Sequence, residues 1–286
     1  MTQEQGSYYL PEPSHWPLVG SVGLFFLLGG FAAFLDGASA LWMAIGAVII
    51  LIMLFGWFGT VIRESEAGMY NDQVDRTFRW SMSWFIFSEV MFFAAFFGAL
   101  FYARVLSGPW LGGEGSNVMT NEVLWKGFEF MWPSDGPAAV GGDYQVMGAW
   151  GIPAINTLIL LTSGVTVTWA HWGVKKGNRG QLILGLFATV ALGFVFVALQ
   201  AYEYGHAYND LNLKLTTGIY GSTFYMLTGF HGLHVTIGAI MLTVMLLRSI
   251  KGHFTAERHF AFEAAAWYWH FVDVVWLGLF IFVYWL

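Results

Sequence analysis

The feature that most restricts the fold of this chain is a series of apolar runs, each long enough to cross a membrane. Hydropathy places seven of them, at about residues 17–35, 41–62, 80–102, 151–172, 181–202, 217–247 and 262–286. An α-helix rises about 1.5 Å per residue, so roughly 20 residues cross a hydrocarbon core of ~30 Å. An open strand cannot satisfy its backbone in lipid. We therefore expect an all-α membrane protein with seven transmembrane helices.

The composition agrees with this fold class and excludes several functions. Hydrophobic residues make up 57% of the chain and charged residues 10%, whereas a soluble domain carries about 25% charged residues. There is no cysteine, which excludes disulfides, Cys-ligated zinc, iron–sulfur clusters and thiolate chemistry. The net charge is −6 without any basic block, so we do not expect a nucleic-acid partner.

The distribution of basic residues predicts the orientation in the membrane. The loops after the second, fourth and sixth runs hold Arg63, Arg76, Arg79, Lys175, Lys176, Arg179, Arg248, Lys251 and Arg258. The loops after the third and fifth runs hold only Arg104, Lys126 and Lys214. Basic loops stay in the cytoplasm, so we expect a cytoplasmic N-terminus and an external C-terminus. The long loop 103–150 should then be an external, irregular cap with one short interfacial helix.

The third run contains a single acid near its centre, Glu89. A charged side chain at this depth costs about 2.5–3.5 kcal/mol on insertion scales, so it should face protein or a wet cavity. We interpret Glu89 as a functional, proton-related acid. The alternative is an acid that is hydrogen-bonded across a helix interface and has only a structural role.

Two histidines in the sixth run, His231 and His234, are three residues apart and share a helix face. A haem or metal site would need further ligands. The candidates are His270 and Asp273 in the seventh run, and Glu203 and His206 at the end of the fifth. No Glu-x-x-His pair of the di-iron type projects inward, so we favour hydrogen-bonded structural histidines and expect no metal.

The seventh run also carries two acids, Glu263 and Asp273, that must be paired or wet inside a membrane. His270 could pair with either of them. Trp57 and Arg63 are six residues apart at the end of the second run, and Arg248 lies at the end of the sixth run. A guanidinium group matches a lipid phosphate well, so these three are candidate lipid contacts, with plain interfacial anchoring as the alternative.

Several motifs resemble one family over nearly the whole chain. They are Pro13-Ser-His-Trp-Pro-Leu18, Val61-Ile-Arg-Glu-Ser65, Phe87-Ser-Glu-Val-Met-Phe-Phe93, Asn156-Thr157 with Ser163 to His171, Leu199-Gln-Ala-Tyr-Glu203, Gly221-Ser-Thr-Phe with Thr228 to Val235, and Phe262 to Leu277. In order and content they are similar to subunit III of the bacterial aa3-type cytochrome c oxidases, which are haem–copper oxidases.

The resemblance implies two helix bundles around a lipid-filled cleft. The first would comprise residues 1–79, with two helices, and the second residues 80–286, with five. The C-terminus would be periplasmic. The resemblance also implies a chain without a redox centre, with haem a, haem a3, CuB and CuA in subunits I and II. The expected partners are subunit I as the main contact, subunit II, a small subunit IV, and structural phospholipids in a bacterial inner membrane.

The implied function is that of a stabilising, non-catalytic subunit. It would support proton uptake and turnover stability of subunit I in an enzyme that passes electrons from cytochrome c to oxygen. Glu89 matches the family's buried carbodiimide-reactive acid, while Trp57, Arg63 and Arg248 match positions linked with lipid. The loop 103–150 is longer than in mitochondrial relatives, and Phe58 and Gly59 depart from the residues that often follow the tryptophan.

Three alternatives remain open. A ubiquinol oxidase subunit III is the nearest, but such relatives usually lack the first two spans. A stand-alone transporter could use Glu89 as its proton site, although the chain has no internal repeat. A haem-binding membrane oxidoreductase would use His231 and His234 as ligands.

Overall fold

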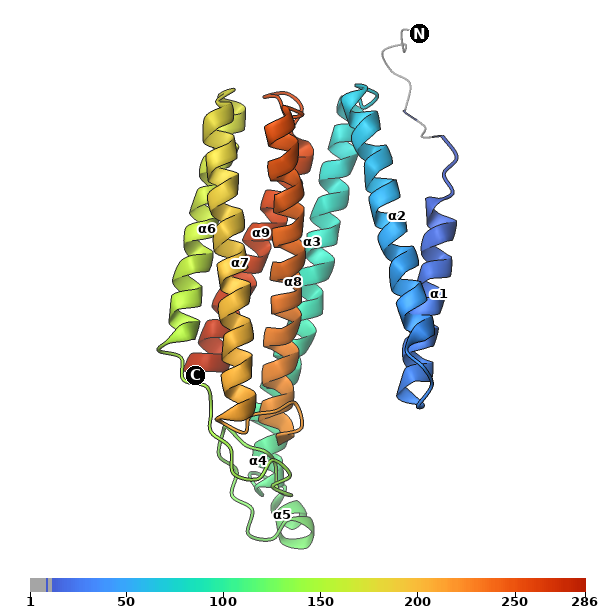
Figure 1. Ribbon diagram of the computed structural model, residues 1–286. Helices are drawn as coiled ribbons and strands as arrows, with labels where there is room; N and C mark the ends of the chain where they lie inside the picture. Colours follow the sequence, from blue (N-terminus) through green and yellow to red (C-terminus); the bar gives the residue numbers. More distant parts are fainter. Residues whose placement is uncertain (1–8, 10–11) are drawn as a thin grey trace. The chain divides into compact units, whose positions relative to one another are not determined.

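The computed structural model of the protein describes residues 9 and 12–286, and no strand occurs in this part of the chain. The helices of Figure 1 are α1 (Trp16–Leu35), α2 (Leu41–Glu66), α3 (Asp72–Phe101), the π-helical turn η1 (Tyr102–Ser107), α4 (Gly108–Leu111), α5 (Val118–Leu124), α6 (Ile152–Lys175), α7 (Arg179–Asn209), α8 (Gly218–Lys251), α9 (Phe260–Leu279) and the π-helical turn η2 (Phe280–Trp285).

Seven helical stretches are long and apolar enough to cross a membrane, which confirms the predicted all-α fold class. The third differs most from its expected bounds, because it runs without interruption over Asp72–Leu111. Its first turns carry Asp72, Asp75 and Arg79, which a search for apolar residues passes over. Arg79 Nε donates to Asp75 Oδ2 at 2.7 Å, an i,i+4 pair that supports a polar helix start.

The chain divides into two compact units, Met1–Trp80 and Ser81–Leu286. In the first unit, α1 and α2 approach closely because two positions lack a side chain. A Cβ at Gly30 would strike the backbone at Trp42 and Met43, and a Cβ at Gly46 would strike the backbone of Leu27. Small residues allow such close contact between membrane helices.

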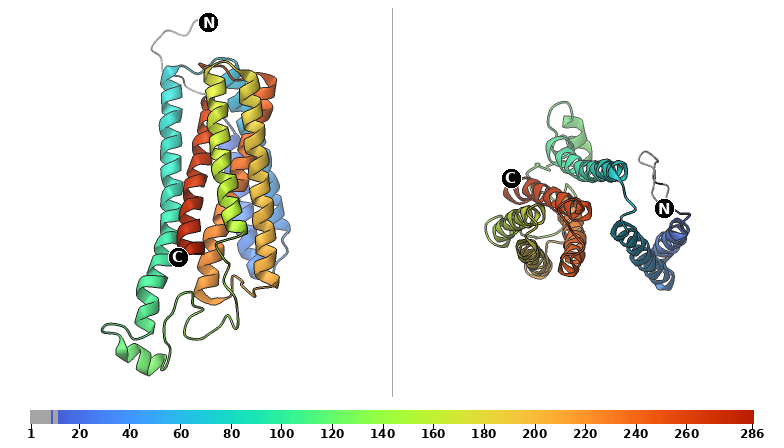
Figure 2. Two further views of the ribbon diagram at one scale, coloured as in Figure 1. Left: turned by 90° about the vertical axis from the view of Figure 1, so that its left-hand side faces the viewer. Right: turned by 90° about the horizontal axis from the view of Figure 1, so that it is seen from above.

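The second unit contains α3 from Ser81 onward and α6 to α9, which run lengthwise beside one another (Figure 1; Figure 2). The most buried of all the spans is α9, with 56% of its most apolar window inside the structure, against 6% for α2. Trp269 of α9 is fully buried. Its ring lies against Gly193 of α7 and Gly238 of α8, where a Cβ would come within 2.8 Å of it. Three helices are thereby held in register.

Two hydrogen bonds from buried tryptophans of α9 join this helix to α6. The indole Nε1 of Trp269 donates to Ser163 Oγ at 2.8 Å, and that of Trp276 donates to Thr157 Oγ1 at 2.9 Å. Rising numbers on α9 meet falling numbers on α6, as expected for antiparallel helices. Each buried indole N–H thus has a partner.

Aromatic rings make much of the contact of α3 with the rest of the second unit. Phe92 packs on Phe230 of α8 with ring centroids 5.0 Å apart, and Phe97 lies over Gly278 of α9. The long loop after α3, with α4 and α5, lies at one end of the unit. The α6–α7 turn and the α8–α9 loop lie together at the other end (Figure 1).

Candidate functional site

The central polar contact of the second unit joins Glu89 to His234. Glu89 lies in the middle of α3, and His234 lies at the midpoint of α8. The carboxylate Oε2 and the imidazole Nε2 are 2.9 Å apart. Each residue therefore supplies the partner that a polar side chain in the interior of a membrane span requires.

The other ring nitrogen of His234 defines how many protons this pair holds. Nδ1 lies 2.6 Å from the carbonyl oxygen of Phe230. A carbonyl can only accept, so Nδ1 carries a hydrogen. The contact between Nε2 and Oε2 then needs one further proton, which belongs either to Glu89 or to His234. In both arrangements the pair holds one shared proton and has no net charge.

The surroundings of the pair are apolar, and its carboxyl group is partly exposed. The imidazole of His234 packs edge-on against Phe93 at 5.0 Å and lies parallel to Tyr268 at 6.3 Å. The side chain of His234 is 10% exposed and that of Glu89 is 22% exposed. The carboxyl group is thus the part of the pair that a proton donor or acceptor outside this unit could reach.

His231 has a separate environment from His234. It is fully buried, its Nε2 lies 3.2 Å from the carbonyl oxygen of Val272 in α9, and its ring packs on Phe196 and Trp276. Outside α8, the hydrogen bond of His231 thus goes to α9 and that of His234 goes to α3. Within residues 12–286, neither belongs to a group of three potential metal ligands.

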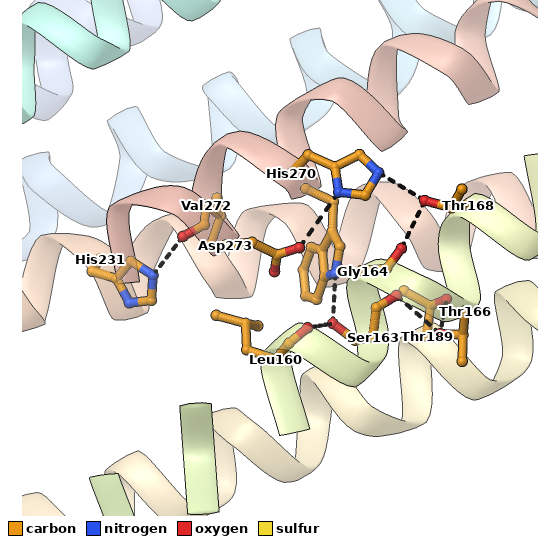
Figure 3. Close-up of polar contacts among 11 residues, drawn as sticks. Leu160, Ser163, Gly164, Thr166, Thr168, Thr189, His231, His270, Val272 and Asp273 are labelled. Carbon is orange, nitrogen blue, oxygen red and sulfur yellow. Dashed lines mark hydrogen bonds and ion pairs between the residues drawn. The ribbon is translucent and has the colours of Figure 1, made fainter. Parts of the chain in front are cut away.

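His270 and Asp273 form a second polar group on α9 (Figure 3). His270 Nδ1 lies 3.5 Å from Asp273 Oδ2, and His270 Nε2 lies 3.2 Å from Thr168 Oγ1 of α6. A Cβ at Gly164 of α6 would collide with the Asp273 carboxylate. The His270 side chain is 45% exposed, so this group borders the outer surface of the α6–α9 pair.

Glu263 lies apart from both groups, at the start of α9 beside His171 and His259. The predicted pairing of His270 is thus realised with Asp273. The pairing of Glu89 with His234, by contrast, was missed at the level of sequence. The signal that could have found it was the need of each mid-span polar group for a partner in another span.

The candidate lipid contacts differ in exposure and lie in different units. In the first unit, Trp57 and Arg63 are both exposed, and Arg63 donates to Thr60 Oγ1 at 3.1 Å. In the second unit, Arg248 is only 8% exposed and its guanidinium lies 4.7 Å from the ring centroid of Phe254. Arg63 is therefore available to an outside phosphate, whereas Arg248 is largely covered by its own chain.

Comparison with known proteins gives a match over nearly the whole chain. The sequence profile of the family described as cytochrome c oxidase subunit III matches residues 6–123 and 131–286. Relatives named cytochrome c oxidase subunit 3 include those of Gadus morhua, at 42% identity, Carassius auratus, at 41%, and Dugong dugon, at 40%. Each alignment covers 100% of this chain and 99% of the relative.

These matches confirm the resemblance derived from the motifs. The residues between the two matched segments, 124–130, belong to the long loop after α3. The three relatives come from fishes and a mammal, so the matches support a multi-pass oxidase subunit and do not establish a bacterial source.

Proposed function

This chain belongs to the cytochrome c oxidase subunit III family, so it is a non-catalytic subunit of an oxidase. We propose that it stabilises the redox-active subunits and supports their supply of protons. In this proposal it assembles mainly with subunit I, and also with subunit II and a small subunit IV. The enzyme transfers electrons from cytochrome c to oxygen. Haem a, haem a3, CuB and CuA would be held by subunits I and II.

The observation that carries the proton-related part is the 2.9 Å contact between Glu89 and His234. The pair holds one proton without net charge, which avoids the cost of an isolated ion in the membrane. Because its carboxyl group is partly exposed, it can exchange that proton with a group outside the second unit. We assign Glu89 the role of a proton-related buried acid and His234 the role of its positioning partner.

The test compares oxidase preparations that contain the wild-type chain, Glu89→Gln, Glu89→Ala or His234→Gln. The measurements are the subunit inventory and the oxygen consumption over repeated turnovers. We expect Glu89→Gln to keep all subunits, because an amide preserves the contact. Glu89→Ala and His234→Gln should shorten the active lifetime. If all three variants kept the wild-type lifetime, the pair would have no part in proton supply.

We further propose that Trp57, Arg63 and Arg248 contact phospholipids. The exposure of the Arg63 guanidinium and of Trp57 on the same helix supports this proposal. The expected in–out orientation, with a cytoplasmic N-terminus and a periplasmic C-terminus, places all three at the cytoplasmic interface. His231, Glu263, His270 and Asp273 have structural roles in the same proposal.

Lipid contact predicts a measurable difference between the two arginines. Copurified phospholipid should fall with Arg63→Ala, and fall less with Arg248→Ala, because Arg248 is already covered by Phe254. The double variant should also shorten the turnover lifetime of the oxidase. Unchanged phospholipid content in Arg63→Ala would remove the support for a lipid contact there.

We propose the bacterial inner membrane as the location, on the basis of the long loop 103–150, part of which the family profile does not match. Fractionation of cells that produce the chain at natural levels tests this. We expect the chain to be recovered with inner-membrane markers of a bacterium. Recovery with mitochondria would refute the proposed bacterial location.

A further inference from the structure

A group of three side chains at one end of the second unit lies outside the proton-related pair and the lipid contacts of the proposed function. It consists of His171, near the end of α6, His259, directly before α9, and Glu263, in the first turn of α9. One ligand atom of each lies within 4.8 Å of the corresponding atoms of the other two. Figure 1 shows both helix ends on the side of the unit opposite to α4 and α5.

The local structure brings these three side chains together. His259 and Glu263 are four residues apart, so they share one face of the helix start. The backbone N–H of Glu263 donates to the carbonyl oxygen of His259 at 3.1 Å. His171 approaches from α6, and its ring centroid lies 5.5 Å from that of His259 at an angle of 59°. All three residues are partly buried.

The imidazole of His259 is held in the form that a metal requires. Its Nδ1 lies 3.1 Å from the carbonyl oxygen of Thr255, so Nδ1 carries the hydrogen and Nε2 keeps its lone pair. Thr255 is itself fixed, because its backbone N–H donates to the carbonyl of Arg258 and its hydroxyl accepts from the N–H of Arg258. A second hydrogen bond of this kind typically orients a metal-bound histidine.

Two imidazoles and one carboxylate select the class of metal. Magnesium and calcium prefer sets of oxygen ligands, whereas zinc is commonly held by two histidines and a glutamate with a fourth position open. Zinc bonds of about 2.0–2.1 Å in a tetrahedron place ligand atoms roughly 3.4 Å apart. Rotation about the side-chain torsion angles of the three residues can shorten the present distances between their ligand atoms, which are within 4.8 Å, to that value.

We propose that His171, His259 and Glu263 bind a Zn²⁺ ion that joins the end of α6 to the start of α9. The ion would fasten the α8–α9 loop to the helix bundle. It lies at the end of the unit away from the long loop, and it uses none of the residues assigned to the proton-related pair or to lipid. This inference is therefore independent of the proposed function.

The test uses the full chain in mild detergent, together with any subunits that copurify. After treatment with a chelator, samples are dialysed against Zn²⁺, and zinc per chain is measured by mass spectrometry. The affinity comes from competition with a chromophoric chelator. We expect the wild type to bind one Zn²⁺ more than His171→Gln or Glu263→Gln, with an affinity at least ~10-fold higher. His253→Gln, a histidine change in the same loop, should match the wild type.

A spectroscopic measurement separates a built site from loose surface binding. Cobalt in place of zinc should give the absorption of a tetrahedral ion in the wild type and lose it in Glu263→Gln. That variant is nearly the size of the native residue, so it carries the test if His171→Gln does not fold. Equal zinc content and affinity in the wild type and Glu263→Gln would overturn the proposal and leave the group as a hydrogen-bonded helix junction.

Discussion

Removal of the Glu89 carboxyl should destabilise the second unit in a way that depends on what replaces it. In Glu89→Ala, Nε2 of His234 loses its partner, and the His234 side chain is only 10% exposed in the wild type. Leaving a buried polar group unsatisfied costs about 1–3 kcal/mol. In Glu89→Gln, the amide N–H can donate to Nε2, because Nδ1 already carries a hydrogen toward Phe230. That variant should therefore cost less than about 1 kcal/mol.

The assay is a denaturant titration of the purified chain in mild detergent micelles, followed by tryptophan fluorescence. It includes Glu89→Ala, His234→Ala and the double variant. The double variant should cost less than the sum of the single ones by roughly 0.5–3 kcal/mol, as for residues in direct contact. Ser88→Ala serves as the control, since Ser88 is exposed and its hydroxyl donates to the carbonyl oxygen of Phe85 in its own helix.

Two results would refute this reasoning. If Glu89→Gln were as destabilising as Glu89→Ala, the contact would depend on an ionised carboxylate with the shared proton on His234, and not on a neutral group that donates to Nε2. If the single and double variants were additive, the contact between Glu89 and His234 would not contribute to stability.

Further predictions concern other parts of the chain. Ser163→Ala should cost about 1–3 kcal/mol in the same titration, because it leaves the buried indole N–H of Trp269 unsatisfied; a loss below about 0.5 kcal/mol would contradict this. Gly164→Ala should cost a similar 1–3 kcal/mol by overpacking against Asp273, and a second change, Asp273→Ala, should restore part of the loss. Burial raises the pKa of Tyr70 above its ordinary value of 10.0, so the folded state binds this proton more tightly than the unfolded state does. Below pH 10 the contribution of this proton to the free energy of unfolding is complete, and above pH 10 the wild type should lose stability relative to Tyr70→Phe. If the free energy of unfolding changed equally with pH in both proteins between pH 9 and about 11, Tyr70 would not contribute.

The number and type of the helices long enough to cross a membrane could be predicted from the sequence, since a membrane span is defined by its own length and polarity. The start of α3 could not, because its first turns are stabilised by charged pairs such as Arg79–Asp75, which hydropathy counts against a helix. The continuation of α3 through η1 into α4 was not predicted either, because Gly108 and Pro109 are typical of a turn and this segment was expected to be loop.

The partners of the histidines were harder to predict than the helices. His231 and His234 are about 60° apart around the axis of α8, since three residues turn a helix by about 300°. That angle is wide enough for one side chain to reach α9 and the other to reach α3. Spacing within one helix suggested a shared site, but the packing of three helices decides which residues meet.

The burial of α9 has a consequence for the biogenesis of the chain. A ribosome releases the first six spans before α9, so the membrane receives α6, α7 and α8 while the space for Trp269 between Gly193 and Gly238 is still without its occupant. The hydroxyls of Ser163 and Thr157 likewise lack the indole N–H donors of the last helix at this stage. Insertion and packing are thus separate events, and a chain stopped before α9 would expose an unfinished interior that quality-control proteases in the membrane can recognise.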